Sequence, residues 1–121
     1  LAPLIRAGAA TVLPMERRSR SQPWIVETCP ASTLKSVDLY PSYKGAGPEK
    51  RKARQAIVNG LIKRNEMPAL PPTLRRLIID NKGGDALDSI IAACATARCL
   101  MAGMFEERTD EISHREGRVY F

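Results

Sequence analysis

Residues 83–98 have the sequence GGDALDSIIAACATAR, the longest run of good helix formers in the chain. Two flexible glycines and an aspartate, a residue type that often caps helices, stand at its start. Small side chains, which allow close packing, follow. The sequence predicts a buried helix that begins near Asp85 and runs to about Met104, and we expect the rest of the fold to pack against it.

Two carboxylates, Asp85 and Asp88, lie three residues apart and therefore project from the same face of this helix's first turn. One interpretation is structural, because acids at this spacing form a variant of the capping box and suit the positive end of the helix dipole. The other is functional. The predicted helix is apolar almost all round, so its start should lie against the interior, where carboxylates are costly unless paired, hydrogen-bonded or bound to metal.

Length and composition indicate one globular domain. The chain has 121 residues and 44% hydrophobic content, and residues 1–121 fit a single domain or domain fragment. It contains no continuous apolar run of membrane-spanning length and no secretory leader pattern, so we expect a cytoplasmic protein that does not contact membranes. The first residue is Leu rather than Met, which suggests that upstream residues are missing.

The cysteine pattern argues against a structural zinc site. The chain has three cysteines, Cys29, Cys94 and Cys99, and no C-x-x-C pair. Cys94 and Cys99 are five residues apart, which does not place both on one face of a helix. An odd number of thiols fits a reducing compartment.

The net charge of +6 permits attraction to nucleic acid. The excess is concentrated in two groups of basic residues, one at Lys44, Lys50, Arg51, Lys52 and Arg54 and another at Arg17, Arg18 and Arg20. Each group has two interpretations, a phosphate-contacting surface or the ordinary solvated face of a helix.

Aromatic and β-branched residues predict a strand at residues 24–29, which ends at Pro30. Its nearly continuous apolar character is typical of a central strand covered on both faces. Glu27 then lies near the carboxyl end of the strand, where ligands gather in open α/β sheets. The alternative is that Glu27 simply faces solvent.

The remaining elements are predominantly helical. The sequence predicts a weak strand at residues 9–13, helices at 31–37, 49–65 and 73–81, a proline- and glycine-rich loop at 40–48, a polar loop at 105–115 and a terminal strand at 116–121. The helix at 49–65 has a basic outer face that includes Lys50, Arg51 and Arg54. One firm strand and one short terminal strand make too small a sheet to bury residues 24–28 on both sides, so we expect upstream sequence or another subunit of a homo-oligomer to complete the sheet.

Four motifs together resemble a known family. They are VETCPASTL at residues 26–34, YKG at 43–45, GDALDSIIAA at 84–93 and EGRVY at 116–120. In this order they resemble the C-terminal portion of domain-of-unknown-function family four-two-nine, regarded as predicted nucleases of the ribonuclease H-like α/β fold. The similarity covers roughly residues 24–121. Arg118 departs from the aromatic residue that commonly follows Glu-Gly in that family.

The resemblance implies that acidic side chains converge to hold a divalent metal, with Glu27 from the central strand and Asp85 and Asp88 from the helix. The family's first-strand acid has no counterpart in this chain. Mg²⁺ and Mn²⁺ prefer such oxygen ligands, and two ions can activate water and stabilise the leaving oxygen in phosphodiester hydrolysis. We assign Lys44 to holding phosphate and assign the guiding of nucleic acid to Lys50, Arg51 and Arg54.

Two other function classes stay open. The chain fits a non-catalytic nucleic-acid-binding or scaffolding module that has lost or lacks the first-strand acid. A cysteine hydrolase built on Cys29 is less favoured, because His114 is the only histidine that could serve as its base.

Overall fold

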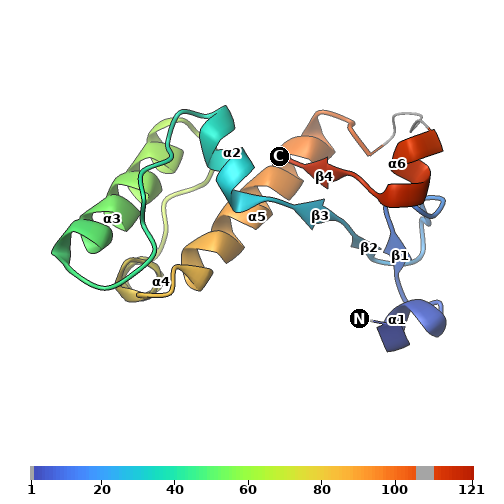
Figure 1. Cartoon of the computed structure of the whole chain (residues 1–121), viewed down its shortest axis with the longest axis horizontal. Coiled ribbons are helices and arrows are strands. Elements are labelled where there is room, and N and C mark those ends of the chain that lie inside the picture. The colour runs from blue at the N-terminus through green and yellow to red at the C-terminus, as the bar shows by residue number, and fades with distance from the viewer. Residues whose placement is uncertain (1, 106–110) are drawn as a thin grey trace.

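A computed structural model describes residues 2–105 and 111–121 as a mixed α/β structure dominated by helix. In chain order the elements are α1 (Ala2–Arg6), β1 (Thr11–Val12), β2 (Trp24–Ile25), β3 (Glu27–Thr28), α2 (Pro30–Ser36), α3 (Pro48–Lys63), α4 (Pro72–Asp80), α5 (Asp85–Met101), α6 (Glu111–Glu116) and β4 (Val119–Tyr120). Helix α5 crosses the middle of the molecule (Figure 1). Helices α3 and α4 lie toward the start of α5, and α2 packs beside it. Strands β3 and β4 lie beside its later turns, and α6 and α1 lie farther from α5 on the same side.

Helix α5 buries one stripe of its surface. The buried residues Leu87, Ile91, Ala95 and Cys99 recur every four positions, the spacing of one helical face. On the opposite side, Met101 is 83% exposed. The predicted helix is therefore confirmed, and the burial predicted for it is found along this one face.

The main hydrophobic core lies around the first half of α5. Its fully buried members are Leu34 of α2, Ile57, Val58 and Leu61 of α3, Ile78 of α4, and Leu87 and Ile91 of α5. Each of these helices begins and ends within a few residues of the predicted bounds. Proline occupies the first turn of α2, α3 and α4, a position that does not require its missing N–H.

The segment predicted as one central strand is divided at Val26. Strand β2 pairs in parallel with β1 through Trp24 and Thr11, and β3 pairs in parallel with β4 through Thr28 and Tyr120. The prediction of a central strand covered on both faces is therefore wrong, because the segment changes partner after two residues and each ladder has only two strands. The predicted terminal strand is confirmed as β4, in shorter form.

Three aromatic rings cluster where α5 meets the strands. The ring of Phe105 lies edge-on to Trp24 and Tyr120, with centroid distances of 6.1 and 4.8 Å. Tyr120 is almost fully buried, so this cluster fixes the ladders against the end of α5. The segment 111–116, predicted as part of a loop, is helical as α6, whereas 106–110 lie outside the described residues.

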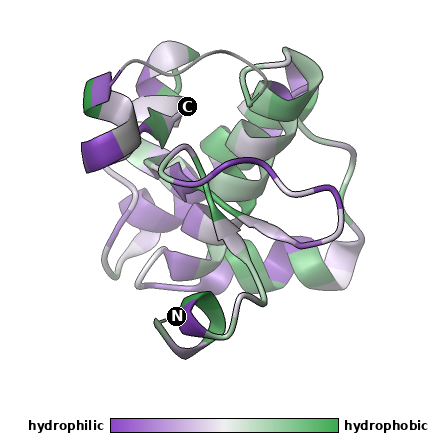
Figure 2. Cartoon of the chain, turned by 90° about the vertical axis from the view of Figure 1, so that its right-hand side faces the viewer, coloured by the Kyte–Doolittle hydropathy of each residue, from purple (hydrophilic) through white to green (hydrophobic). Residues whose placement is uncertain are grey.

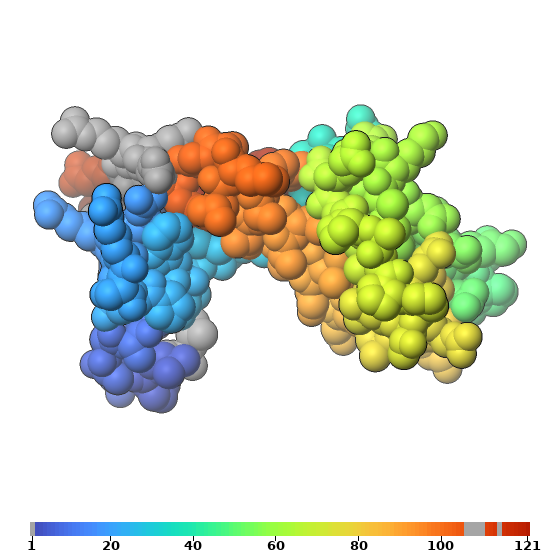
Figure 3. Space-filling view, turned by 180° about the vertical axis from the view of Figure 1, so that it is seen from behind, coloured from blue at the N-terminus to red at the C-terminus, as the bar shows by residue number. Residues whose placement is uncertain are grey.

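Seen from behind, the molecule has two masses joined by the orange surface of α5 (Figure 3). One contains the N-terminal segments and the other contains α3 and α4, and the surface is hollowed between them. Part of the N-terminal helix is coloured as hydrophobic in Figure 2. Leu4 of this helix is 53% exposed. Within residues 2–105 and 111–121, no helix combines the length and the apolar character that crossing a membrane requires.

Candidate functional site

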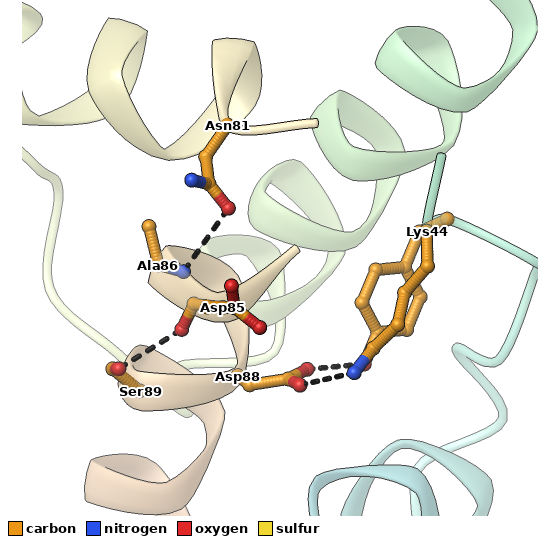
Figure 4. Close-up of polar contacts among 7 residues, drawn as sticks. Lys44, Asn81, Asp85, Ala86, Asp88 and Ser89 are labelled. Carbon is orange, nitrogen blue, oxygen red and sulfur yellow. Dashed lines mark hydrogen bonds and ion pairs between the residues drawn. The ribbon is translucent and has the colours of Figure 1, made fainter. Parts of the chain in front are cut away.

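Asp88 in the first turns of α5 is bound to the loop that follows α2. The hydroxyl of Tyr43 donates a hydrogen bond to its Oδ1, and the Nζ of Lys44 lies 2.6 Å from its Oδ2 (Figure 4). Tyr43 is only 4% exposed, whereas the Lys44 side chain is 57% exposed. The carboxylate is thus held by a buried phenol and by a cation that reaches it from solvent.

Gly84 allows this loop to approach the start of α5. It is the N-cap of α5 and adopts the left-handed conformation, with φ of 84°. A Cβ at this position would lie 3.1 Å from Cγ of Lys44 and 3.2 Å from Cε2 of Tyr43. Both the backbone conformation and the close packing therefore require glycine.

The helix cap does not use the two acids. Gly84 is the N-cap and Asp85 is the first helical residue, while the backbone N–H of Ala86 donates a hydrogen bond of 3.3 Å to Oδ1 of Asn81. The Asp85 carboxylate forms no hydrogen bond or ion pair with the part of the chain that the structure describes. It lies on the same side of α5 as the Asp88 carboxylate (Figure 4). The capping-box interpretation is therefore wrong, although both charges still suit the helix dipole.

A cavity of about 330 Å³ opens beside Asp88. We call it the Asp88 cavity; it is lined by Cys29, Pro30, Ala31, Tyr40, Ser42, Tyr43, Lys44 and Asp88. These residues come from the start of α2, the following loop and α5. The cavity therefore joins two of the motifs that carry the family resemblance, 26–34 and 84–93, to the Tyr-Lys pair between them.

Three ionisable side chains of this cavity are perturbed. The hydrogen bond and charge of Asp88 raise the pKa of Lys44, so its ammonium stays charged. Burial, and secondarily Asp88, hold the pKa of Tyr43 above its usual range. A hydrogen bond from Ser32 lowers the pKa of the Cys29 thiol. Tyr43 was not predicted as a site residue. Its hydrogen bond to Asp88, 45 residues later in the chain, depends on the tertiary fold and leaves no local sequence pattern.

Glu27 is not brought to this cavity. In β3 it pairs with the exposed Val119, while its neighbour Thr28 pairs with the buried Tyr120, so Glu27 lies on the outer face of the ladder. Across residues 2–105 and 111–121, no group of three or more His, Cys, Asp or Glu residues is placed to hold a metal ion. The expected meeting of Glu27 with Asp85 and Asp88 is thus not found, because the strand register turns Glu27 outward.

The basic residues of α3 have different positions. Lys50 borders the Asp88 cavity, since its Nζ lies 2.6 Å from Oγ of Ser42. Arg51 is exposed and its Nε lies 2.8 Å from Oδ1 of Asp80. Lys44 and Arg51 are therefore exposed, and Lys50 is partly exposed.

Arg54, by contrast, is 2% exposed. Its Nε donates to the carbonyl of Ile79 at 2.7 Å, and its Nη1 donates to the carbonyls of Tyr43 and Gly45 at 2.7 and 3.1 Å. The assignment of Arg54 to a nucleic-acid-binding face is wrong, because this side chain holds the loop and α4 together. Its spacing of three, four and seven residues from Ile57, Val58 and Leu61 was a sequence signal for burial.

The chain matches no protein-family model, no curated protein and no solved structure. The resemblance drawn from the four motifs therefore stays a prediction.

The oxygen atoms at the start of α5 are of the type that binds hard cations. Asp85 and Asp88 offer carboxylate oxygens on one side of the helix, and Mg²⁺ is commonly held by one or two carboxylates together with substrate phosphate. The Lys44 ammonium already neutralises one oxygen of Asp88. The arrangement places the Asp88 carboxylate, an exposed ammonium and a buried phenol at one cavity, with the Asp85 carboxylate on the same side of α5.

Proposed function

We propose that this chain is a metal-dependent nuclease that hydrolyses phosphodiester bonds of nucleic acid at the start of α5, in a ribonuclease H-like arrangement. The observation that supports this most is the use of Asp88: its carboxylate faces the cavity and Lys44 instead of capping its own helix. Because Oδ1 of Asn81 binds the Ala86 N–H, the cap uses neither Asp85 nor Asp88, which leaves both carboxylates for a ligand.

Asp85 and Asp88 are the proposed ligands of Mg²⁺ or Mn²⁺. When bound, such an ion supplies an activated water and stabilises charge on the leaving oxygen. Tyr43 fixes the orientation of Asp88 through its hydroxyl. Lys44 is 57% exposed, so its ammonium is free to turn from Asp88 to a phosphate oxygen that enters the cavity. Lys50, held by Ser42 at the rim, adds a second positive charge for the substrate backbone.

Cleavage assays on labelled single-stranded, duplex and hybrid substrates test this proposal. We expect cleavage with Mg²⁺ or Mn²⁺, none with EDTA, and none with Asp85→Asn or Asp88→Asn. The matched control is Asp38→Asn, because Asp38 is exposed and its positive φ of 50° suits asparagine. Cleavage that persists in EDTA, or that proceeds at the parent rate in both α5 variants, would contradict the proposal.

A second candidate is a nucleic-acid-binding module without catalysis. Two observations favour it: the described residues contain no group of three metal ligands, and Asp88 is already paired with Lys44. The same assay separates the two functions. Salt-sensitive binding with no cleavage under any metal condition would support the module.

A further inference from the structure

A second cavity, of about 320 Å³, lies between α3 and α4, apart from the Asp88 cavity. Three guanidinium groups line it, those of Arg51, Arg75 and Arg76, together with the amide of Gln55. We call it the arginine cavity. Its remaining lining residues are apolar, so its walls carry no acidic side chain.

Arg75 is positioned but incompletely satisfied. Its Nη2 donates a hydrogen bond to Oδ1 of Asn59, which fixes the guanidinium against α3. Its Nε is buried and finds no hydrogen-bond partner among the described residues. A buried donor without a partner is costly, so the Arg75 guanidinium is held against α3 with one of its donors unsatisfied.

The other two arginines leave positive charge available. Arg76 forms no side-chain hydrogen bond or ion pair with any residue the structure describes. Arg51 uses its Nε for the Asp80 carboxylate at 2.8 Å, so one of the three positive charges is neutralised. The cavity keeps an excess of two positive charges and planar donors of the geometry that suits phosphate.

Arg51 connects the arginine cavity to a further cavity on the side of the proposed catalytic loop. Arg51 also lines a neighbouring cavity of about 290 Å³ that includes Lys82. The carbonyl of Lys82 accepts a hydrogen bond of 2.8 Å from the backbone N–H of Gly45, the residue after Lys44. The lining of this neighbouring cavity also includes Asp80, whose carboxylate pairs with Arg51, so the path from α4 to the loop that carries Lys44 is lined by basic residues and this acid.

We infer that the arginine cavity binds a backbone phosphate of a nucleic-acid strand whose scissile bond lies at the Asp88 cavity. The inference deepens the proposed function, since both need a nucleic-acid ligand. Phosphate contacts of this kind fix the register of the strand and carry no base specificity.

Binding of a fluorescein-labelled single-stranded oligonucleotide, followed by anisotropy in EDTA over a series of salt concentrations, tests the inference without cleavage. The variants are Arg75→Gln/Arg76→Gln and Arg76→Gln alone. The latter removes no intramolecular contact and should fold as the parent does. The control is Arg64→Gln, which removes the same charge from an exposed arginine at the end of α3, outside the arginine cavity.

We expect the double variant to bind more weakly and to lower the slope of log affinity against log salt by ~0.7, the value for the loss of one phosphate contact with a single strand. Arg76→Gln alone should lower the slope by a smaller amount, because Arg75 remains in the cavity, and the control should match the parent. Parent-like slopes in both variants, or an equal loss in Arg64→Gln, would overturn the inference. Asp85→Asn should leave the slope of log affinity against log salt at the parent value, because Asp85 contacts no phosphate in the arginine cavity. If the parent fails to cleave but the slopes change as expected, only the catalytic proposal fails.

Discussion

Asp88, Tyr43 and Arg54 illustrate what single residues contribute to this site. The Asp88 carboxylate is oriented by the Tyr43 hydroxyl, and the backbone carbonyl of Tyr43 is held by Arg54. The same arginine also binds the carbonyls of Ile79 and Gly45. One buried guanidinium therefore supports the loop that presents both Tyr43 and Lys44 to α5.

Replacing Tyr43 by Phe should lower the free energy of unfolding by about 1 kcal/mol, because it removes a hydrogen bond to a charged, half-buried acceptor. Tyr40→Phe is the control, since Tyr40 is 49% exposed. Urea unfolding measures both. Equal stability of the two variants would show that the Tyr43 hydroxyl does not hold Asp88.

Arg54→Met should be the most destabilising substitution in α3. It keeps much of the side-chain volume but leaves three carbonyls without their donor, at a cost of about 3 kcal/mol or more. Arg51→Met, one turn earlier and exposed, should cost less than ~1 kcal/mol. If chemical denaturation gives similar values for both, Arg54 does not support the loop as described.

Cys29 should be alkylated at lower pH than Cys94. The thiolate is the nucleophile, and a hydrogen bond from Ser32 lowers the pKa of Cys29 while burial raises that of Cys94. As pH rises, iodoacetamide should therefore modify Cys29 first, then Cys94, with the fully buried Cys99 last. Peptide mass spectrometry follows the three sites. Earlier modification of Cys94 would contradict the arrangement around Cys29.

At the scale of elements, the start of α5 depends on Gly84. Gly84→Ala forces an alanine into positive φ and places its Cβ against Lys44 and Tyr43. Gly47→Ala, also at positive φ, meets no atom within 4 Å. Both should be destabilised by about 1 kcal/mol, and Gly84→Ala by about 1 kcal/mol more because of overpacking. Thermal melts that rank the two variants equally would mean that the loop does not pack on Gly84.

The helices were predictable from sequence and the strands only in part. Proline at the first turns and apolar spacing located α2, α3 and α4, since local signals determine where helices begin. The division at Val26 was not predictable, because it depends on which distant segments pair with β2 and β3. The outward direction of Glu27 follows from that pairing. The expected cluster of three acids is therefore not found because Glu27 points away, whereas Asp85 and Asp88 lie on the same side of α5.

At the scale of the whole molecule, the site lies where the helical core meets the loop after α2. The core residues of α2, α3 and α4 pack around the first half of α5, which fixes the helix start while the strands contact its later turns. This position leaves the Asp88 cavity open to solvent beside the basic residues of α3. The net charge of +6 then favours a polyanionic ligand at this face.

The central claim is that the first turn of α5 holds a hard cation beside Lys44. Amide NMR spectra recorded during a titration with Mn²⁺ test it directly, because this paramagnetic ion broadens the signals of nearby nuclei. The account predicts that broadening begins at residues 84–89 and 43–45 at the lowest Mn²⁺ concentrations and is lost in Asp85→Asn/Asp88→Asn. Broadening centred elsewhere, or unchanged in that double variant, would contradict it.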